Sequence, residues 1–241
     1  MDPTLWIVTI SVLGPVIGST IGVMRMPSFG YICNMLCFAA GVMLAISFLE
    51  LVPESLKLSS PAMAIAGVFI GSTVMYGLDR IIPHIHPKLC AQEQGCNLER
   101  TSVYLLLGMF LHNFPEGMAI AIGTVSGVNV SLAIALAIAI HNIPEGICTS
   151  APYYHSTGKR LKSFLLSSST ALPVLAGYVT AKYLFQSISP QIVGLLSGAT
   201  AGLMIYITAD ELIPNSCTGT NHQTIFSLIL GIAFVMVLGM L

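Results

Sequence analysis

Charged residues are scarce in this sequence. Asp, Glu, Lys and Arg together make up 8% of its 241 residues, whereas hydrophobic residues make up 55%. Because a soluble domain carries about 25% charged residues, this composition excludes a chain whose surface faces water on all sides. The net charge of −1 provides no basic field, so nucleic acid is not an expected partner. A mean hydropathy of +0.86 instead indicates an integral membrane protein that lies in a lipid bilayer.

Other features that the sequence lacks narrow the class further. The six cysteines are scattered and do not form the pattern of a disulfide scaffold. The first residues lack the positive region and the cleavage site of a signal peptide, so we expect the first apolar run to be a retained helix. The apolar stretches are continuous and do not alternate with period two, which argues against a β-barrel.

Continuous apolar runs predict an all-α integral membrane protein with eight transmembrane helices. Each run is close to the roughly 20 residues that cross the hydrocarbon core as a helix. No break between runs is long enough for a separate soluble domain, so residues 1–241 form a single transmembrane domain. The predicted spans are 5–25, 32–52, 62–83, 101–124, 128–149, 161–185, 190–213 and 223–241.

The lysines and arginines predict the orientation. With eight spans and an outside N-terminus, seven of these nine residues fall at the inner face, and only Lys57 and Lys182 fall outside. This distribution follows the positive-inside rule. We therefore expect both termini outside the cell membrane and a cytoplasmic loop at 84–100. That loop contains His84, His86, Cys90 and Cys96, which we interpret as a solvated loop with incidental ligands, or alternatively as a metal-capturing segment.

Several carboxylates fall where a membrane helix would normally exclude them. An ionised side chain at this depth costs a few kcal/mol, so it usually lines a cavity or binds an ion. Five of them on four helices favour a polar pathway through the bundle. They are Glu50, Glu116, Glu145, Asp210 and Glu211.

One pattern, His-Asn-x-Pro-Glu-Gly, occurs twice inside apolar segments, 29 residues apart. In each copy the His and Glu are four residues apart and the Asn and Glu three apart, so they lie close together on a helix. A short connection at 123–127 makes the two helices antiparallel neighbours whose motifs face each other. The shared donors are His112, Asn113, Glu116, His141, Asn142 and Glu145.

This donor set indicates a transition metal as the ligand. Imidazole suits zinc, copper, iron and nickel, and two histidines with two carboxylates suit tetrahedral Zn²⁺. The motifs contain no thiolate, which favours an exchangeable ion over a structural one. The prolines free backbone carbonyls near the histidines, and such irregular backbone is tolerated in a membrane where it lines a cavity. Proline kinks with polar contacts between helices would be the purely structural interpretation.

The sequence resembles the ZIP (Zrt/Irt-like) divalent metal transporter family, in particular its GufA-like branch. The two motifs resemble that family's fourth and fifth helices, the run 38–44 followed by Glu50 resembles its second helix, and 209–214 resembles its seventh. The match extends over nearly the whole chain in the same order. It implies a bundle with inverted three-helix repeats around a central metal-binding helix pair.

The resemblance also implies roles for particular residues. His112, Glu116, His141 and Glu145 would bind the transported ion, while Asn113 and Asn142 would flank a second position. Met43, Ser47 and Glu50 share a face of the second helix, and in relatives that face lines the pathway. Met43 and Glu50 are therefore candidate metal contacts; core filling is the alternative for Met43.

One departure from the family pattern concerns the second metal position. Relatives with two metal ions often have a glutamate before the proline of the sixth helix, whereas here Leu172 precedes Pro173. Asn142 also stands where some relatives have aspartate. We therefore expect one tightly bound ion.

The predicted function is transport of divalent transition-metal ions, zinc first, into the cytosol, with cadmium, iron and manganese as further substrates. Zinc is then the substrate, and no cofactor is expected. The alternatives are a passive channel that uses the same site and an intramembrane metalloenzyme. The chain lacks the His-Glu-x-x-His motif of a metalloprotease, so we do not expect an enzyme. The expected partners are the metal ion and the lipid bilayer, with a homodimer left open.

Overall fold

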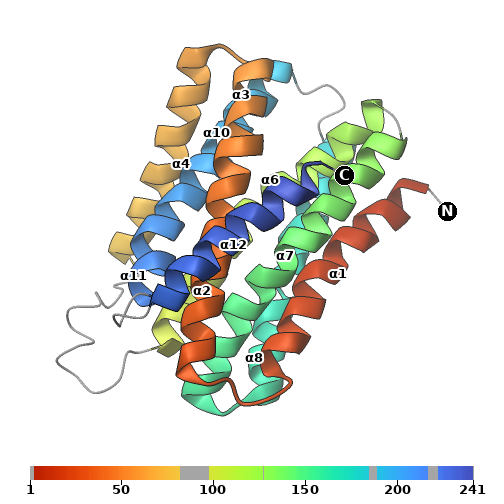
Figure 1. The fold of residues 1–241 in the computed structure, drawn as a ribbon. Helices are drawn as coiled ribbons and strands as arrows, with labels where there is room; N and C mark the ends of the chain where they lie inside the picture. Colours follow the sequence, from red (N-terminus) through yellow and green to blue (C-terminus); the bar gives the residue numbers. More distant parts are fainter. Residues whose placement is uncertain (1–2, 82–97, 127, 185–188, 217–221, 241) are drawn as a thin grey trace.

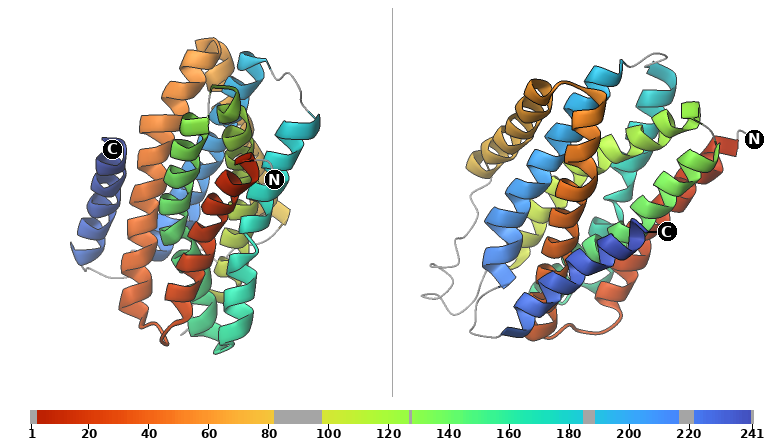
Figure 2. Two further views of the ribbon diagram at one scale, coloured as in Figure 1. Left: turned by 90° about the vertical axis from the view of Figure 1, so that its right-hand side faces the viewer. Right: turned by 45° about the horizontal axis from the view of Figure 1, so that its top comes forward.

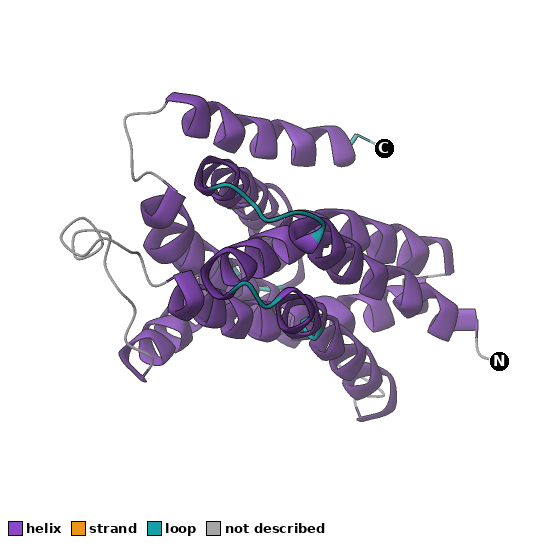
Figure 3. Cartoon of the chain, turned by 90° about the horizontal axis from the view of Figure 1, so that it is seen from below, coloured by secondary structure: helices purple, strands orange, loops and turns teal. Residues whose placement is uncertain are grey.

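The protein is a bundle of helices (Figure 1). The computed structural model describes residues 3–81, 98–126, 128–184, 189–216 and 222–240, in which every secondary-structure element is a helix (Figure 3). The first half of the chain forms α1 (Pro3–Val23), α2 (Phe29–Ile46), η1 (Ser47–Leu51), α3 (Val52–Leu58), α4 (Pro61–Ile81) and α6 (Leu98–Ser126). The second half forms α7 (Val128–Thr157), α8 (Arg160–Ser168), α9 (Ala171–Val179), η2 (Thr180–Leu184), α10 (Pro190–Ile207), η3 (Thr208–Leu212), α11 (Ile213–Ser216) and α12 (His222–Leu238).

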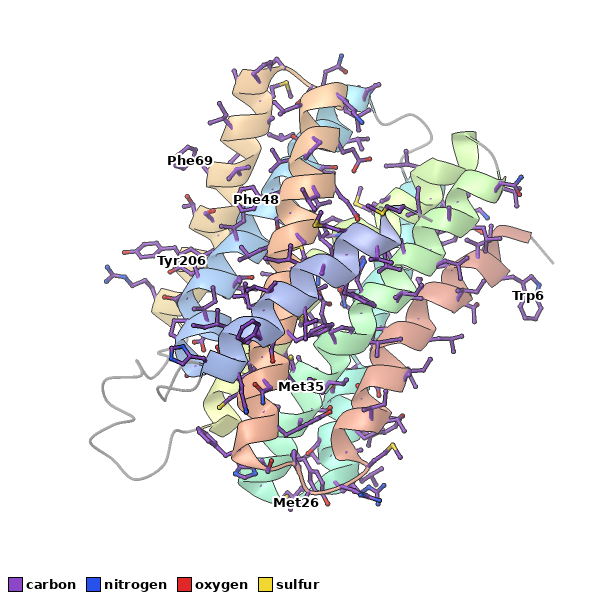
Figure 4. The ribbon with its side chains drawn as sticks, viewed as in Figure 1. Trp6, Met26, Met35, Phe48, Phe69 and Tyr206 are labelled. Carbon is purple, nitrogen blue, oxygen red and sulfur yellow. The ribbon has the colours of Figure 1, made fainter. Side chains whose placement is uncertain are left out.

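These elements give the predicted eight crossings. In the described part of the chain, seven helical stretches are long and apolar enough to span a membrane, and α12 adds an apolar helix of 17 residues. The lipid-facing surface is correspondingly apolar: Trp6, Phe48 and Phe69 project away from the bundle and are 56% to 68% exposed (Figure 4). The predicted cytoplasmic loop lies mostly on residues 82–97, outside the described residues, and α6 already begins at Leu98.

Two helices end later than the predicted 52 and 149, and both continue through a proline. The second span continues through Pro53 to Leu58, because the π-helical segment η1 comes first and the proline takes the first turn of α3, where no N–H is needed. Helix α7 runs through Pro152 to Thr157, beyond the predicted end at 149. A proline inside a membrane helix therefore does not mark a helix end here.

Two segments of the chain have the same construction. Helix α2 and helix α10 each have 18 residues, and each continues into a five-residue π-helix. In both cases one residue separates the end of the π-helix from a proline. Residues 40–55 and 201–216 match at Ala, Gly, Met, Ile, Glu, Leu, Pro and Ser. Ser47 donates to the Met43 carbonyl, and Thr208 donates to the Met204 carbonyl, both at 2.7 Å. These are two copies of one unit, running in opposite directions.

The packing of the surrounding helices obeys the same internal symmetry. Helix α1 packs on α7, and α9 packs on α6. A Cβ atom on Gly18 would lie 2.1 Å from the Ile143 carbonyl oxygen, and one on Gly177 would lie 1.9 Å from that of Phe114. Ile143 and Phe114 occupy the same place in the two motifs. Likewise α12 packs on α2 as α4 packs on α10, and Figure 2 shows α12 on the outside of the bundle beside α2.

The predicted inverted three-helix repeats around a central pair are therefore present. One repeat comprises α1, α2–α3 and α4, the other comprises α8–α9, α10–α11 and α12, and α6 with α7 lies between them (Figure 1). Only residue 127 separates α6 from α7, so the two are antiparallel neighbours. This arrangement brings the two His-Asn-x-Pro-Glu-Gly motifs together in the bundle interior.

Candidate metal site

The six motif side chains that could bind metal, on α6 and α7, are all buried. None is more than 8% exposed, and His112 and Asn142 are fully inaccessible. A buried carboxylate or imidazole needs a partner of complementary charge or a hydrogen bond. The partners of these side chains are consequently informative about what the site does.

Each motif histidine contacts the glutamate of the opposite helix. His112 Nε2 lies 3.1 Å from Glu145 Oε2, and His141 Nε2 lies 3.1 Å from Glu116 Oε1. His112 Nε2 is also 3.9 Å from Glu116 Oε1, within its own motif. The four side chains therefore form one continuous network that joins α6 to α7.

The remaining hydrogen bonds fix the orientation of the candidate ligands. His112 Nδ1 donates to the Gly108 carbonyl at 3.2 Å; because a carbonyl only accepts, this bond places a proton on Nδ1 and leaves Nε2 as the metal-binding nitrogen. Such a bond behind a ligating imidazole is usual in metal sites. Asn142 Nδ2 donates a 3.2 Å hydrogen bond to Glu116 Oε2, while the other oxygen of that carboxylate, Oε1, contacts His141.

Asn113 is turned away from this network. Its Nδ2 donates to the Thr170 carbonyl at 2.7 Å, at the break between α8 and α9. The bond ties the first motif to the sixth span, so the side chain has a structural role in addition to the predicted flanking role. Leu172, the position before the sixth-span proline, is 59% exposed, so a carboxylate there would not face the site.

Three buried oxygens at the site have no hydrogen-bond donor among the described residues: Asn113 Oδ1, Asn142 Oδ1 and Glu145 Oε1. A buried acceptor without a partner costs about 1–3 kcal/mol, and native structures contain few of them. All three are oxygens that accept and do not donate. A cation or the hydrogens of a buried water molecule would satisfy them.

The three printed N···O separations of these side chains can be compared with those of a zinc site. With bonds of 2.0–2.1 Å, two ligand atoms of a tetrahedral zinc ion are about 3.3 Å apart; the separations here are 3.1, 3.1 and 3.9 Å. Among the described residues, however, no group of three or more His, Cys, Asp or Glu side chains is arranged so that it could hold a metal ion as it stands. The side chains are hydrogen-bonded to one another instead, and metal binding would require them to move and to lose the bridging protons.

The two candidates on the second span differ in their surroundings. Met43 is fully buried within a hydrophobic cluster that also contains Met204 and Ile207, as its core-filling interpretation predicts. Glu50 lies on η1 with an exposed side chain and is close enough to His141 and Glu116 to interact electrostatically with both. Glu50 is therefore the candidate that faces the buried site, whereas Met43 is part of the hydrophobic core.

The sequence analysis did not include Glu211 among the site residues. Glu211 occupies in the second repeat the place that Glu50 occupies in the first, but it is buried and accepts a 2.6 Å hydrogen bond from Asn215 Nδ2. Both glutamates lie on π-helical segments, which occur frequently at functional sites. The repeated Glu-Leu-x-Pro sequence was the signal that could have identified this pair.

Comparison with known proteins agrees with this architecture. The family model for the ZIP zinc transporter matches residues 88–239. The chain is 36% identical over 206 residues to proteins named zinc transporter ZupT from Salmonella newport and from Salmonella typhimurium; the match covers 82% of this chain and 80% of each relative. A family model that spans both motifs and relatives matched over four fifths of their length give one conclusion: the chain belongs to the ZIP zinc transporter family.

Proposed function

We propose that this protein carries Zn²⁺ into the cytosol through the site formed by His112, Glu116, His141 and Glu145. As a member of the ZIP family, the chain is a membrane transporter of divalent metal ions and not an enzyme. The observation that supports this route is the buried imidazole–carboxylate network, with acceptor oxygens that lack donors. A cation bound among these side chains would satisfy both the carboxylates and the amide oxygens.

The ligand types fit an ion that is bound and then released. Nitrogen and oxygen ligands without thiolate allow zinc, cadmium, iron and manganese to compete for one site. Glu50, on η1, and Glu211, on η3, provide two further carboxylates that the ion could use on its way through the bundle. The membrane potential supplies about 4.6 kcal/mol per 100 mV for a divalent ion that moves inward.

The proposed direction depends on the orientation of the bundle. Lys159, Arg160 and Arg25 lie at one end of the helices, while Lys57 lies in the last turn of α3 at the other end. By the positive-inside rule the first group is cytoplasmic, which places both termini outside the plasma membrane. A homodimer within the bilayer stays a prediction.

Zinc uptake into proteoliposomes tests this function. We expect uptake of radioactive zinc to saturate with concentration and to be inhibited by cadmium more strongly than by magnesium, since imidazole ligands disfavour the harder ion. The site side chains are at most 8% exposed, as a carrier with an enclosed site requires. Flux that rises linearly with concentration without saturation would instead support the channel alternative.

The number of bound ions is a second expected result. A second divalent ion a few ångströms from the first meets a repulsion of several kcal/mol even at an effective dielectric constant of about 20. The nearby extra donors, Asn113 and Asn142, are neutral. Calorimetry on the purified protein should therefore give one tightly bound zinc per chain, and two ions of comparable affinity would contradict this account.

A further inference from the structure

The sixth span is interrupted between α8 and α9, where its backbone forms a tighter turn. Pro173 has no N–H to offer the Ser169 carbonyl, which instead accepts from the Leu172 N–H at 3.0 Å. The Thr170 N–H also bonds back only three residues, to the Ser167 carbonyl at 3.1 Å. The side chains of Ser167 and Thr170 are at most 3% exposed, so the turn places two hydroxyls in the bundle interior.

The Ser167 hydroxyl uses its whole hydrogen-bonding capacity. It donates to the Gly146 carbonyl at 3.0 Å and accepts from Ser19 Oγ at 2.7 Å, and Thr149 Oγ1 is also in hydrogen-bond contact with it. A hydroxyl has one proton and two lone pairs, so with its proton on Gly146 it accepts from Thr149 as well. Because Gly146 directly follows Glu145, Ser167 restrains the backbone of the second motif beside a candidate ligand.

Thr170, at the other end of the same turn, restrains the first motif. Its carbonyl accepts from Asn113 Nδ2 at 2.7 Å, and its hydroxyl donates to the Ser167 carbonyl at 2.8 Å. Asn113 directly follows the candidate ligand His112. The Ser167–Thr170 segment is therefore hydrogen-bonded to both motifs, to one at each of its ends.

The two copies of the motif differ in the residues that follow them. Three and four residues after the motif glycine, the first copy has Ile120 and Ala121, which belong to an apolar cluster. The second copy has Thr149 and Ser150 at these positions, and Ser150 also donates to the glycine carbonyl of that motif, at 2.6 Å. The first motif packs without such hydroxyls, so helix packing alone does not require them beside the second.

We propose that the Ser167–Thr170 segment is the positioning element of the metal site and sets the separation of the two motifs. This role rests on the function proposed above, because it concerns the same four candidate ligands. Their contacts cross between α6 and α7, so their geometry depends on how these two helices are placed. Binding sites need supporting hydrogen bonds that hold the ligands to within about 0.5 Å. Ser167 acts through Gly146, and Thr170 acts through Asn113.

Calorimetric titration of the purified full-length protein with zinc tests this role, because it separates affinity from the fraction of protein that binds. Ser167→Ala should weaken zinc binding about tenfold at unchanged stoichiometry, the lower end of the effect of losing an outer-shell partner. Ser55→Ala is the matched control: Ser55 is equally buried and donates to a glycine carbonyl of another helix, that of Gly194, at 2.6 Å. We expect the melting temperatures of both variants to fall by similar amounts, with wild-type zinc affinity in Ser55→Ala.

A second pair of variants decides the question even if Ser167→Ala does not fold. Thr149→Val keeps the shape of the side chain and removes the hydroxyl that donates to Ser167, so it should weaken zinc binding several-fold. Thr149→Ser keeps the hydroxyl and should restore the wild-type affinity.

The expected pattern supports the positioning role, and two results overturn it. One is equal zinc affinity in Ser167→Ala and Ser55→Ala, whether both match the wild-type protein or both are weakened. The other is equal affinity in Thr149→Val and Thr149→Ser. Unchanged zinc binding in the double variant His112→Ala/His141→Ala is a separate result, which would contradict the proposed site itself and the positioning role with it.

Discussion

Replacement of Glu116 or Glu145 with alanine is expected to abolish zinc uptake while the protein remains inserted in the membrane. Each glutamate contacts the histidine of the opposite helix at 3.1 Å, so either substitution removes one proposed metal ligand and the partner of one imidazole. Loss of an outer-shell partner alone costs 10–100-fold in metal affinity. We therefore expect uptake to fall by about two orders of magnitude or more, measured with radioactive zinc in proteoliposomes.

Two controls separate loss of the site from loss of the fold. The isosteric variants Glu116→Gln and Glu145→Gln preserve the volume and remove the charge, so they should fail in transport as completely as the alanine variants. Glu54→Gln changes an exposed carboxylate that accepts only a 3.5 Å bond from Ser197, and it should retain most uptake. Wild-type rates in well-folded Glu116 or Glu145 variants would show that the ion takes another route.

The substitution Gly117→Ala is expected to destabilise the protein severely. A Cβ atom at this position would lie 1.9 Å from the Val174 carbonyl oxygen, and the reciprocal Gly177 would place one 1.9 Å from that of Phe114. Both obstacles are backbone atoms, so only a displacement of α6 from α9 relieves the overlap. Overpacking commonly costs 1–3 kcal/mol, and this contact should cost at least about 3 kcal/mol. Size-exclusion profiles and melting temperatures of the purified variants measure the effect.

Gly77→Ala is the matched control for this prediction. Gly77 lies inside α4 and has no atom within 4 Å of a Cβ position. Alanine there should be neutral or should stabilise the helix by about 1 kcal/mol, the difference in helix propensity. A Gly117→Ala variant that melts at the same temperature as Gly77→Ala would contradict the close approach of α6 and α9.

The central part of the site follows from the sequence because helix geometry determines it. The spacing of His112 to Glu116 and of His141 to Glu145 places each pair on one face, and the short connection makes the two helices neighbours. The structure adds that the hydrogen bonds cross between the helices, so each histidine contacts the other motif's glutamate. That pairing depends on the relative rotation of α6 and α7, which sequence spacing does not determine.

The errors in the sequence analysis come from tertiary contacts. The second and fifth spans end later than predicted, because the helices continue through Pro53, after a π-helical segment, and through Pro152. The rotation of α9 turns Leu172 outward. Asn113 contacts Thr170 at the break between α8 and α9, which the continuous apolar sequence does not reveal. Glu211 was expected only as one of five carboxylates of a polar pathway, and its correspondence to Glu50 becomes visible when residues 40–55 and 201–216 are compared as two copies of one unit.

X-ray absorption at the zinc edge, on protein loaded with one equivalent of zinc, tests the central claim most directly. We predict a first shell of nitrogen and oxygen atoms at 2.0–2.2 Å, the distances of imidazole and carboxylate ligands, with the imidazole scattering of His112 and His141. The imidazole contribution should be lost in the double variant His112→Ala/His141→Ala. A first shell that contains sulfur at about 2.3 Å, or a spectrum unchanged in the double variant, would contradict the assignment of the metal to this site.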